Sequence, residues 1–292
     1  MRKYKIPFTV FLLLSILIIA VSCGAEGQGQ VAAPGGFAEQ SIIVRGDGIE
    51  SELTFTLAEL ASLPDANFEH IYSTINNWPT ARFYAARGIR IDAILLASGV
   101  LDTVQSVTFR SHDSYEVTIT RKQLLEEQQY YYPLVSEGSG EGAETVYPLI
   151  AYEFKEGAAD MPAAQPDDFC LIIGQRNHLE HTNPAFVENL KEIVVSGEPP
   201  EQWDMAGIFP ASGIIPSGET IKLQHPDFGL VKIFYTLDGS LPTEMSAMYN
   251  PSTYQPELNK PIVFTGDATL KALVSGFGKE NSDIAEFEIK VQ

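Results

Sequence analysis

The sequence carries little positive charge. Its 292 residues include 19 lysine and arginine residues against 38 aspartate and glutamate residues, which gives a formal net charge of −19 at pH 7. A surface with this excess of acidic groups repels nucleic acid and anionic lipid headgroups. We therefore predict that the protein has no nucleic-acid partner.

The sequence also lacks an apolar run long enough to cross a membrane with ease. Its longest uncharged, mostly apolar run covers residues 6–21, which is 16 residues, whereas a spanning helix needs ~20. Arg2, Lys3 and Lys5 precede this run and small residues follow it, which is the pattern of a secretory signal peptide. Removal of residues 1–22 would leave 16 basic residues against 38 acidic ones, a net charge of −22.

Cysteine is scarce as well, because Cys23 and Cys170 are the only two. The segment Ala20-Val21-Ser22-Cys23 resembles the lipobox of bacterial lipoproteins, in which the cysteine is diacylated and becomes the new N-terminus. The resemblance implies a lipid anchor on Cys23 and an extracytoplasmic protein, at the cell surface or on the periplasmic face of a membrane. The alternative is an ordinary signal peptide with an incidental cysteine. With Cys23 lipidated, no intramolecular disulfide can form.

Composition divides the chain into five segments. Residues 24–36 are small and Gly-rich, as in a flexible tether. The stretch Glu198-Pro199-Pro200-Glu201 has the composition of a stiff, charged linker. We therefore expect a signal peptide at 1–22, a lipidated flexible tether at 23–40, a first folded domain at 41–197, a linker at 198–207 and a second domain at 208–292.

Helices and strands are interspersed in the first domain, which predicts an α+β fold. Thr56 and Glu59 have the spacing of a capping box and predict a helix over residues 57–62. A second helix is expected from Asp92 to a closing Gly99. The expected strands are residues 41–44, 53–55, 105–110, 115–120, 149–154 and 169–173, with a short polar helix at 121–129 and a helical turn running into a final strand at 186–195.

Five short motifs of this domain follow one another in a recognisable order. They are residues 88–99 (GIRIDAILLASG), 107–115 (VTFRSHDSY), 149–152 (LIAY), 171–174 (LIIG) and the segment 186–195. Together they resemble the molybdopterin-binding oxidoreductase family, whose fold is the sulfite-oxidase-like fold. The resemblance implies an α+β domain and a molybdenum cofactor held by a cysteine thiolate upstream of residues 88–99, near a tryptophan.

The sequence departs from that family at the residues that would hold the cofactor. Residues 70–78 include Trp78 but no cysteine, and soft metal centres favour thiolate ligands. The K-W pair of the family reads Glu188-Asn189 here, which puts a carboxylate where a cation would meet the cofactor phosphate. The N-terminus also carries no twin-arginine signal, the usual export route for proteins loaded with this cofactor. We therefore predict a domain without molybdopterin and assign no catalytic residue.

Four residues of the first domain are candidates for ligand binding: Trp78, Arg82, His112 and Arg176. Arg82 clusters with Arg87 and Arg90, which could hold an anion or could form a solvated face with internal ion pairs. His112 and Asp113 could form a general-base pair or could simply make the turn of a hairpin.

The segment from Asn177 to His181 carries the only local pattern of metal ligands. His178 and His181 lie three residues apart with Glu180 between them, and two imidazoles with this spacing could bind Zn²⁺. No third ligand can be assigned from the sequence. A solvated polar loop is the alternative interpretation.

The second domain shows short, alternating strands at close spacing and no helical pattern. Such strands in about 85 residues predict a small β-sandwich. Residues 234–243 (FYTLDGSLPT) closely resemble the hallmark of the chitobiase/β-hexosaminidase C-terminal family, also called the Fn3-associated module, and Asp238-Gly239 forms its tight turn. The resemblance implies an immunoglobulin-like accessory domain without catalytic activity.

These features favour a membrane-anchored binding or adhesion protein, with a polysaccharide or an envelope protein as its partner. Two alternatives stay open. One is an extracytoplasmic molybdopterin-dependent oxidoreductase, or a subunit of one. The other is a surface protein that binds metal through His178 and His181.

Overall fold

The computed structural model describes residues 40–76, 80–157, 168–249 and 262–292. Residues Ala33–Gln292 form one compact unit. Within the described ranges, no helix is long and apolar enough to cross a membrane. The predicted signal peptide, the anchor at Cys23 and the candidate Trp78 lie outside these ranges and stay predictions, as does the division into domains.

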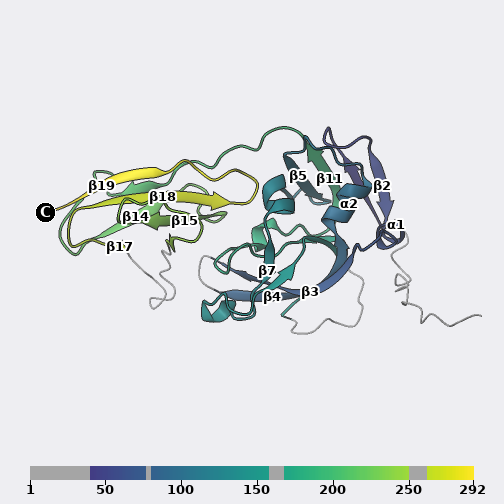
Figure 1. The fold of residues 1–292 in the computed structure, drawn as a ribbon, viewed down its shortest axis with the longest axis horizontal. Helices are drawn as coiled ribbons and strands as arrows, with labels where there is room; N and C mark the ends of the chain where they lie inside the picture. The colour runs from purple at the N-terminus through teal and green to yellow at the C-terminus, as the bar shows by residue number, and fades with distance from the viewer. Residues whose placement is uncertain (1–39, 77–79, 158–167, 250–261) are drawn as a thin grey trace, which may run out of the picture. The chain divides into compact units, whose positions relative to one another are not determined.

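Two sheets organise the chain up to residue 196 (Figure 1). The first is five-stranded, in the order β2-β1-β11-β5-β6. Its strands are β1 (Ser41–Arg45), β2 (Leu53–Thr56), β5 (Ser106–Ser111), β6 (Glu116–Thr120) and β11 (Leu190–Ser196). β1 and β11 pair in parallel, whereas the other neighbours are antiparallel.

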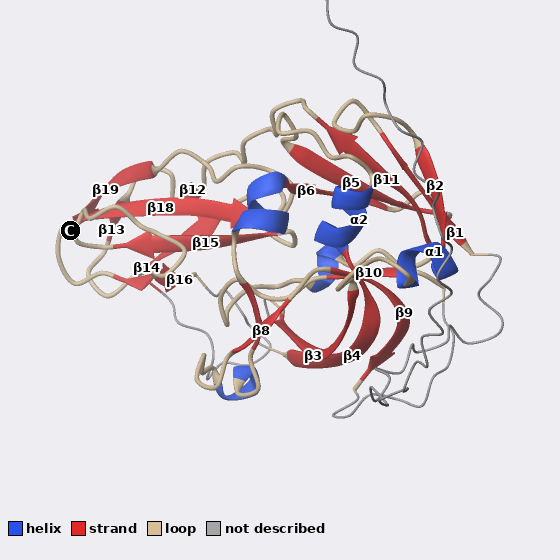
Figure 2. Cartoon of the chain, turned by 45° about the vertical axis from the view of Figure 1, so that its right-hand side comes forward, coloured by secondary structure: helices blue, strands red, loops and turns tan. Residues whose placement is uncertain are grey.

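The second sheet is antiparallel and four-stranded, in the order β10-β9-β4-β3. Its strands are β3 (Asn67–Ile75), β4 (Ala81–Arg90), β9 (Leu149–Glu156) and β10 (Cys170–Ile172). A separate pair joins β7 (Gln129–Tyr131) to β8 (Glu144–Val146). In Figures 1 and 2, α2 (Ile91–Ala97) lies between the two larger sheets.

Two of the three predicted helices form as α-helices, and local signals explain why. At the start of α1 (Leu57–Ala61), the Thr56 hydroxyl accepts the Glu59 N–H at 3.3 Å, and the Glu59 carboxylate accepts the Thr56 N–H at 2.8 Å. This reciprocal pair is the predicted capping box. α2 is followed by Gly99 at φ +67°, a left-handed conformation that glycine adopts without strain.

One hydrophobic cluster unites these sheets and helices. It includes Ile42 of β1, Phe109 of β5, Ile89 of β4 and Leu149 of β9, all fully buried. α2 adds Ile91, Ile94 and Leu95 from one face. The apolar residues that define the predicted strands and helices are therefore the ones that build this core.

The C-terminal part forms two sheets over a second hydrophobic cluster. The sheet orders are β12-β14-β17 and β13-β19-β18-β15-β16. The strands are β12 (Gly207–Phe209), β13 (Ile214–Ile215), β14 (Thr220–Gln224), β15 (Val231–Thr236), β16 (Ala247–Met248), β17 (Ile262–Val263), β18 (Ala268–Gly276) and β19 (Ala285–Val291). The described residues of this part contain strands and no helix, as predicted for the second domain.

The structure differs from the sequence-based prediction in several segments, among them the β3–β4 hairpin, residues 121–129 and residues 186–195. The long β3–β4 hairpin was not predicted, because the end of β3 is buried on both faces and shows no alternation. Residues 121–129 form only a π-helical turn (Lys122–Glu126) before β7 begins. The helical turn expected within 186–195 lies earlier, as a 3₁₀ turn at Asn183–Ala185, where proline favours a helix start.

Candidate functional site

The end of β3 is the region where the family resemblance would place a metal-binding thiolate. Ser73 and Thr74 occupy it, and both are fully buried. The Ser73 hydroxyl donates to Gln175 Oε1 at 2.6 Å and accepts the Tyr132 N–H at 2.8 Å. Thr74 Oγ1 accepts the N–H of Thr182 at 2.9 Å. These hydroxyls therefore serve to hold β3 against the segments around Tyr132 and 174–182.

Cys170 supplies no alternative ligand. It lies on β10 opposite Ala151 and is almost fully buried among apolar residues. A buried thiol in apolar surroundings behaves as a small hydrophobic residue. Because molybdenum favours thiolate and the end of β3 offers only engaged hydroxyls, the described residues of this region do not fit a thiolate-held molybdenum cofactor.

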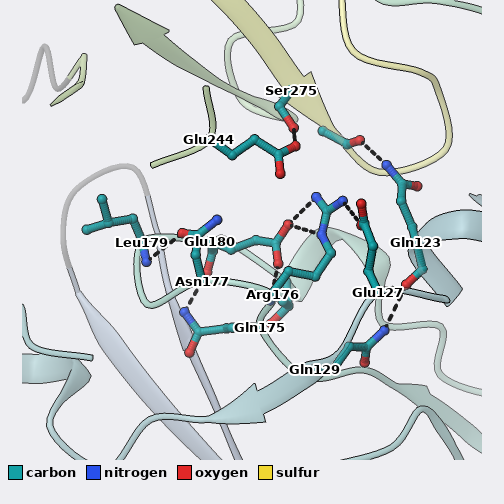
Figure 3. A network of polar contacts seen from close by, with 12 residues as sticks. Gln123, Glu127, Gln129, Gln175, Arg176, Asn177, Leu179, Glu180, Glu244 and Ser275 are labelled. Carbon is teal, nitrogen blue, oxygen red and sulfur yellow. Dashed lines mark hydrogen bonds and ion pairs between the residues drawn. The ribbon is translucent and has the colours of Figure 1, made fainter. Parts of the chain in front are cut away.

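Arg176 lies at the centre of a buried polar network (Figure 3). Its side chain is only 8% exposed. Nε donates to Glu180 Oε1 at 2.8 Å, Nη1 donates to Glu127 Oε2 at 2.6 Å, and Nη2 also pairs with Glu180. Burial acts to lower the pKa of Arg176, but the Glu180 charge and its hydrogen bonds outweigh burial and raise it. The guanidinium of this candidate residue is thus neutralised by protein carboxylates.

The loop between β18 and β19 contacts this network. Gln123 Nε2 donates to the Gly276 carbonyl at 2.7 Å, and Gln123 Oε1 accepts the Gly278 N–H at 3.0 Å. The Phe277 ring lies 5.0 Å from the Arg176 guanidinium carbon, a cation–π contact. Two hydrogen bonds between the Gln123 side chain and the backbone at residues 276–278, together with one ring contact, therefore fix this segment against the first part of the chain.

Glu244 adds a further carboxylate near Arg176. It accepts the Ser275 hydroxyl at 2.6 Å and the Asn281 amide at 3.2 Å. Burial acts to raise the pKa of Glu244, but the Arg176 charge and these hydrogen bonds lower it. Glu244 therefore stays ionised and adds a third negative charge near Arg176, beside those of Glu127 and Glu180.

His181 lines a small cavity beside the network, together with Glu180, Lys232 and Ser275. The cavity volume is about 20 Å³, which is room for about one water molecule. Burial, followed by the charges of Lys232 and Arg82, lowers the pKa of His181 to about 4. Burial also lowers the pKa of Lys232 to about 8, against the opposing charge of Glu180. Because the pKa of His181 is about 4, its imidazole is neutral at pH 7.

The predicted zinc ligands are not joined by a third one. His178 lies beside the Tyr132 ring, with 6.1 Å between ring centroids. Glu180, the residue between the two histidines, binds Arg176. Among the residues that the structure describes, no three His, Cys, Asp or Glu side chains come together as a metal site. Zinc binding by His178 and His181 stays a prediction.

The arginine cluster takes the form of ion pairs on the second sheet. Arg82 of β4 pairs with Glu156 at 2.9 Å, and both side chains are about half exposed. Arg87 binds Glu69 at 2.6 Å and Glu153 at 2.8 Å. The Arg82–Glu156 pair thus lies on a solvated face, whereas the Glu153 partner of Arg87 is buried, and the choice between an ion-paired face and an anion site stays a prediction.

His112 lies in the turn between β5 and β6 and is exposed. Its neighbour Asp113 accepts the Tyr115 N–H at 3.0 Å, and this bond and the Ser111 hydroxyl hold the pKa of Asp113 below its usual value. Asp113 therefore stabilises the turn through its carboxylate. This geometry supports the hairpin-turn interpretation of the pair.

Comparison with known proteins identifies the C-terminal module. Residues 221–289 match the family model described as Fn3 associated. This confirms the resemblance predicted from residues 234–243, and the matched residues include strands β15 and β18 and most of β19. Among solved structures, the sulfane dehydrogenase SoxCD from Paracoccus pantotrophus is distantly similar, with 10% sequence identity, a TM-score of 0.37 and coverage of 87% of this chain and 76% of that one. No curated protein matches the chain.

The partly buried imidazole of His181 predicts a pH-dependent stability. The folded pKa of His181 is about 4 and its ordinary value is 6.5, so between these pH values the unfolded chain binds a proton that the folded chain does not. The stabilisation is therefore complete above pH 6.5 and is lost as the pH falls toward 4, by about 3 kcal/mol. Urea unfolding of a His181→Asn variant is expected to show a shallower loss between pH 7 and pH 4 than the native protein shows.

A His112→Asn variant, changed at the exposed β5–β6 turn, is the matched control for that experiment. Its stability is expected to follow the native pH dependence. Equal slopes for the native protein and His181→Asn would contradict a neutral His181 imidazole with a lowered pKa.

Proposed function

We propose that the protein is a lipid-anchored, extracytoplasmic binding protein that uses no molybdenum cofactor. The observation that carries this proposal is the pair of buried hydroxyls at the end of β3. Ser73 and Thr74 stand where the resembling family would hold its metal, and both serve as structural hydrogen-bond partners. A domain whose cofactor ligand is replaced in this way keeps a folded surface for binding and loses the redox centre.

Two further features support a binding role. Arg176, the buried cation of the first part, is held by Glu127 and Glu180 and so does not serve a phosphate-bearing cofactor. The Fn3-associated module at residues 221–289 is fixed to the network around Arg176 through the β18–β19 loop. A stably joined pair of modules suits recognition of an extended partner such as a polysaccharide or an envelope protein.

The anchor is tested by changing Cys23. A Cys23→Ser chain, expressed in a bacterium with a lipoprotein pathway, is expected to leave the membrane fraction, because the acyl chains supply most of the membrane affinity. Fractionation and labelling with radioactive palmitate measure this. More than nine-tenths of the native protein should sediment with membranes, and the variant should carry no label.

Cys170→Ser is the matched control, since it removes the other thiol while leaving the anchor intact. It is expected to stay labelled and membrane-bound. Retention of the Cys23→Ser chain in the membrane fraction would contradict lipid anchoring at this residue.

The binding role is tested with the purified full-length protein in detergent. Co-sedimentation with isolated envelope polysaccharide, and surface-based binding to purified envelope proteins, should reveal a saturable partner. Pterin fluorescence after acid oxidation is measured on the same sample. Saturable binding without a pterin signal supports the proposal, whereas a stoichiometric pterin signal would contradict it.

A further inference from the structure

A groove of about 530 Å³ lies between three segments of the chain. One wall is the β5–β6 hairpin, the second is the segment 196–203, and the third is the β18–β19 loop with Leu230. None of the residues predicted from the sequence to bind a ligand lines it. Its volume lies within the range of small-molecule sites, which is roughly 300–1,000 Å³.

The hairpin wall presents hydroxyl groups to the groove. Successive strand residues point to opposite faces, and Val107, Phe109 and Ile119 pack in the core. The groove is lined instead by Ser106, Thr108 and Thr118. The Thr108 and Thr118 hydroxyls lie 2.8 Å apart, so one donates to the other, and the pair still offers a proton and lone pairs to a ligand.

Two aromatic rings in the groove are held in fixed orientations. Tyr115 is 46% exposed, and its hydroxyl donates to the Pro184 carbonyl at 2.6 Å. Phe277 lies against the Arg176 guanidinium at 5.0 Å. Rings that are already positioned lose little conformational entropy when a ligand packs against them.

A third aromatic residue of the lining carries an unmatched donor. Trp203 lines the groove and is more than nine-tenths buried. Its indole N–H has no acceptor among the described residues. The indole nitrogen itself is enclosed by the protein, so Trp203 contributes its ring to this wall rather than a donor that a ligand could reach.

The charges of the lining are largely balanced. Glu116 pairs with Arg110 at 2.7 Å, and Glu201 pairs with Lys279 at 2.7 Å. The chain as a whole is strongly acidic and Glu198 adds an exposed carboxylate to the lining, which disfavours an anionic ligand, while the two ion pairs reduce the field that would attract a cation. A neutral ligand with many hydroxyl groups and apolar faces matches such a lining.

We propose that this groove binds a neutral oligosaccharide. Sugar hydroxyls would exchange hydrogen bonds with the threonine pair and with the groove carboxylates, and the apolar face of a sugar ring would pack on Tyr115. The proposal rests on the binding function proposed above and assigns its ligand class and its site.

The test is calorimetric titration of the full-length protein with neutral linear hexasaccharides of glucose, mannose, galactose and N-acetylglucosamine. At least one is expected to bind. Tyr115→Ala should weaken that binding at least tenfold, which corresponds to about 1.4 kcal/mol. Thr108→Val should weaken it severalfold, and Tyr115→Phe, which keeps the ring, should bind within about threefold of the native protein.

Phe209→Ala is the matched control, because Phe209 is an exposed aromatic residue of β12 outside the groove; it should bind as the native protein does. Equal binding by the native protein, Tyr115→Ala and Thr108→Val would overturn the assignment of the site. Failure of all four hexasaccharides to bind would overturn the ligand class. Neither result would contradict the proposed function. That function would be contradicted by a stoichiometric cofactor in the purified protein.

Discussion

Replacing Arg176 by alanine is expected to lower the free energy of unfolding by about 3–5 kcal/mol. The change removes the positive partner of a buried carboxylate, because Glu180 is as well buried as Arg176. Glu180 would then carry an uncompensated charge in the protein interior. Since whole domains are stable by only about 5–15 kcal/mol, urea unfolding followed by circular dichroism will show this loss clearly.

Arg82→Ala is the matched control for that experiment. Arg82 also pairs with a glutamate, but both side chains of the Arg82–Glu156 pair are about half exposed, and exposed pairs contribute only about 0–1 kcal/mol. A double variant, Arg176→Met with Glu180→Gln, should recover part of the loss because no buried charge remains at position 180. A loss below 1 kcal/mol for Arg176→Ala would contradict the structural role of the network.

Gly278→Ala is expected to detach the β18–β19 loop and to lower the free energy of unfolding by about 2–3 kcal/mol. Gly278 has φ +86°, and a Cβ at this position would lie 2.5 Å from the Thr118 carbonyl oxygen. That oxygen belongs to strand β6 and has little room to shift. The loop must therefore move, and its bonds to Gln123 would be lost with it.

Urea unfolding measures the stability of this variant, and limited proteolysis reports on the loop, which should become a cleavage site. Gly266→Ala is the control, because Gly266 lies in the same module and a Cβ there meets no atom within 4 Å. It should change the free energy of unfolding by less than about 0.5 kcal/mol. A Gly278→Ala protein as stable and as protease-resistant as the native one would contradict the close contact.

Features set by neighbouring residues could be predicted from the sequence. The capping box needs only Thr56 and Glu59, so α1 was predicted correctly. The β5–β6 hairpin follows from alternating residues around one turn. Residues 234–243 carry enough sequence identity in one stretch to indicate the Fn3-associated module.

Features set by distant residues could not be predicted in the same way. The end of β3 is buried by the segments around Tyr132 and 174–182, so its sequence lacks the alternation of a half-exposed strand. The partner Glu127 lies 49 residues from Arg176 along the chain. Glu180 was assigned to a zinc pattern with its neighbouring histidines, whereas in the fold it balances Arg176. No pattern in the sequence signals Gln123, whose role depends on the β18–β19 loop.

The proposed binding function requires that no redox centre is present in a domain whose motifs resemble redox enzymes. The hydroxyls of Ser73 and Thr74 carry that claim. Elemental analysis of the purified full-length protein, produced in a host that makes molybdenum cofactor, tests it most directly. We expect no stoichiometric molybdenum in this protein. One molybdenum atom per chain would contradict it.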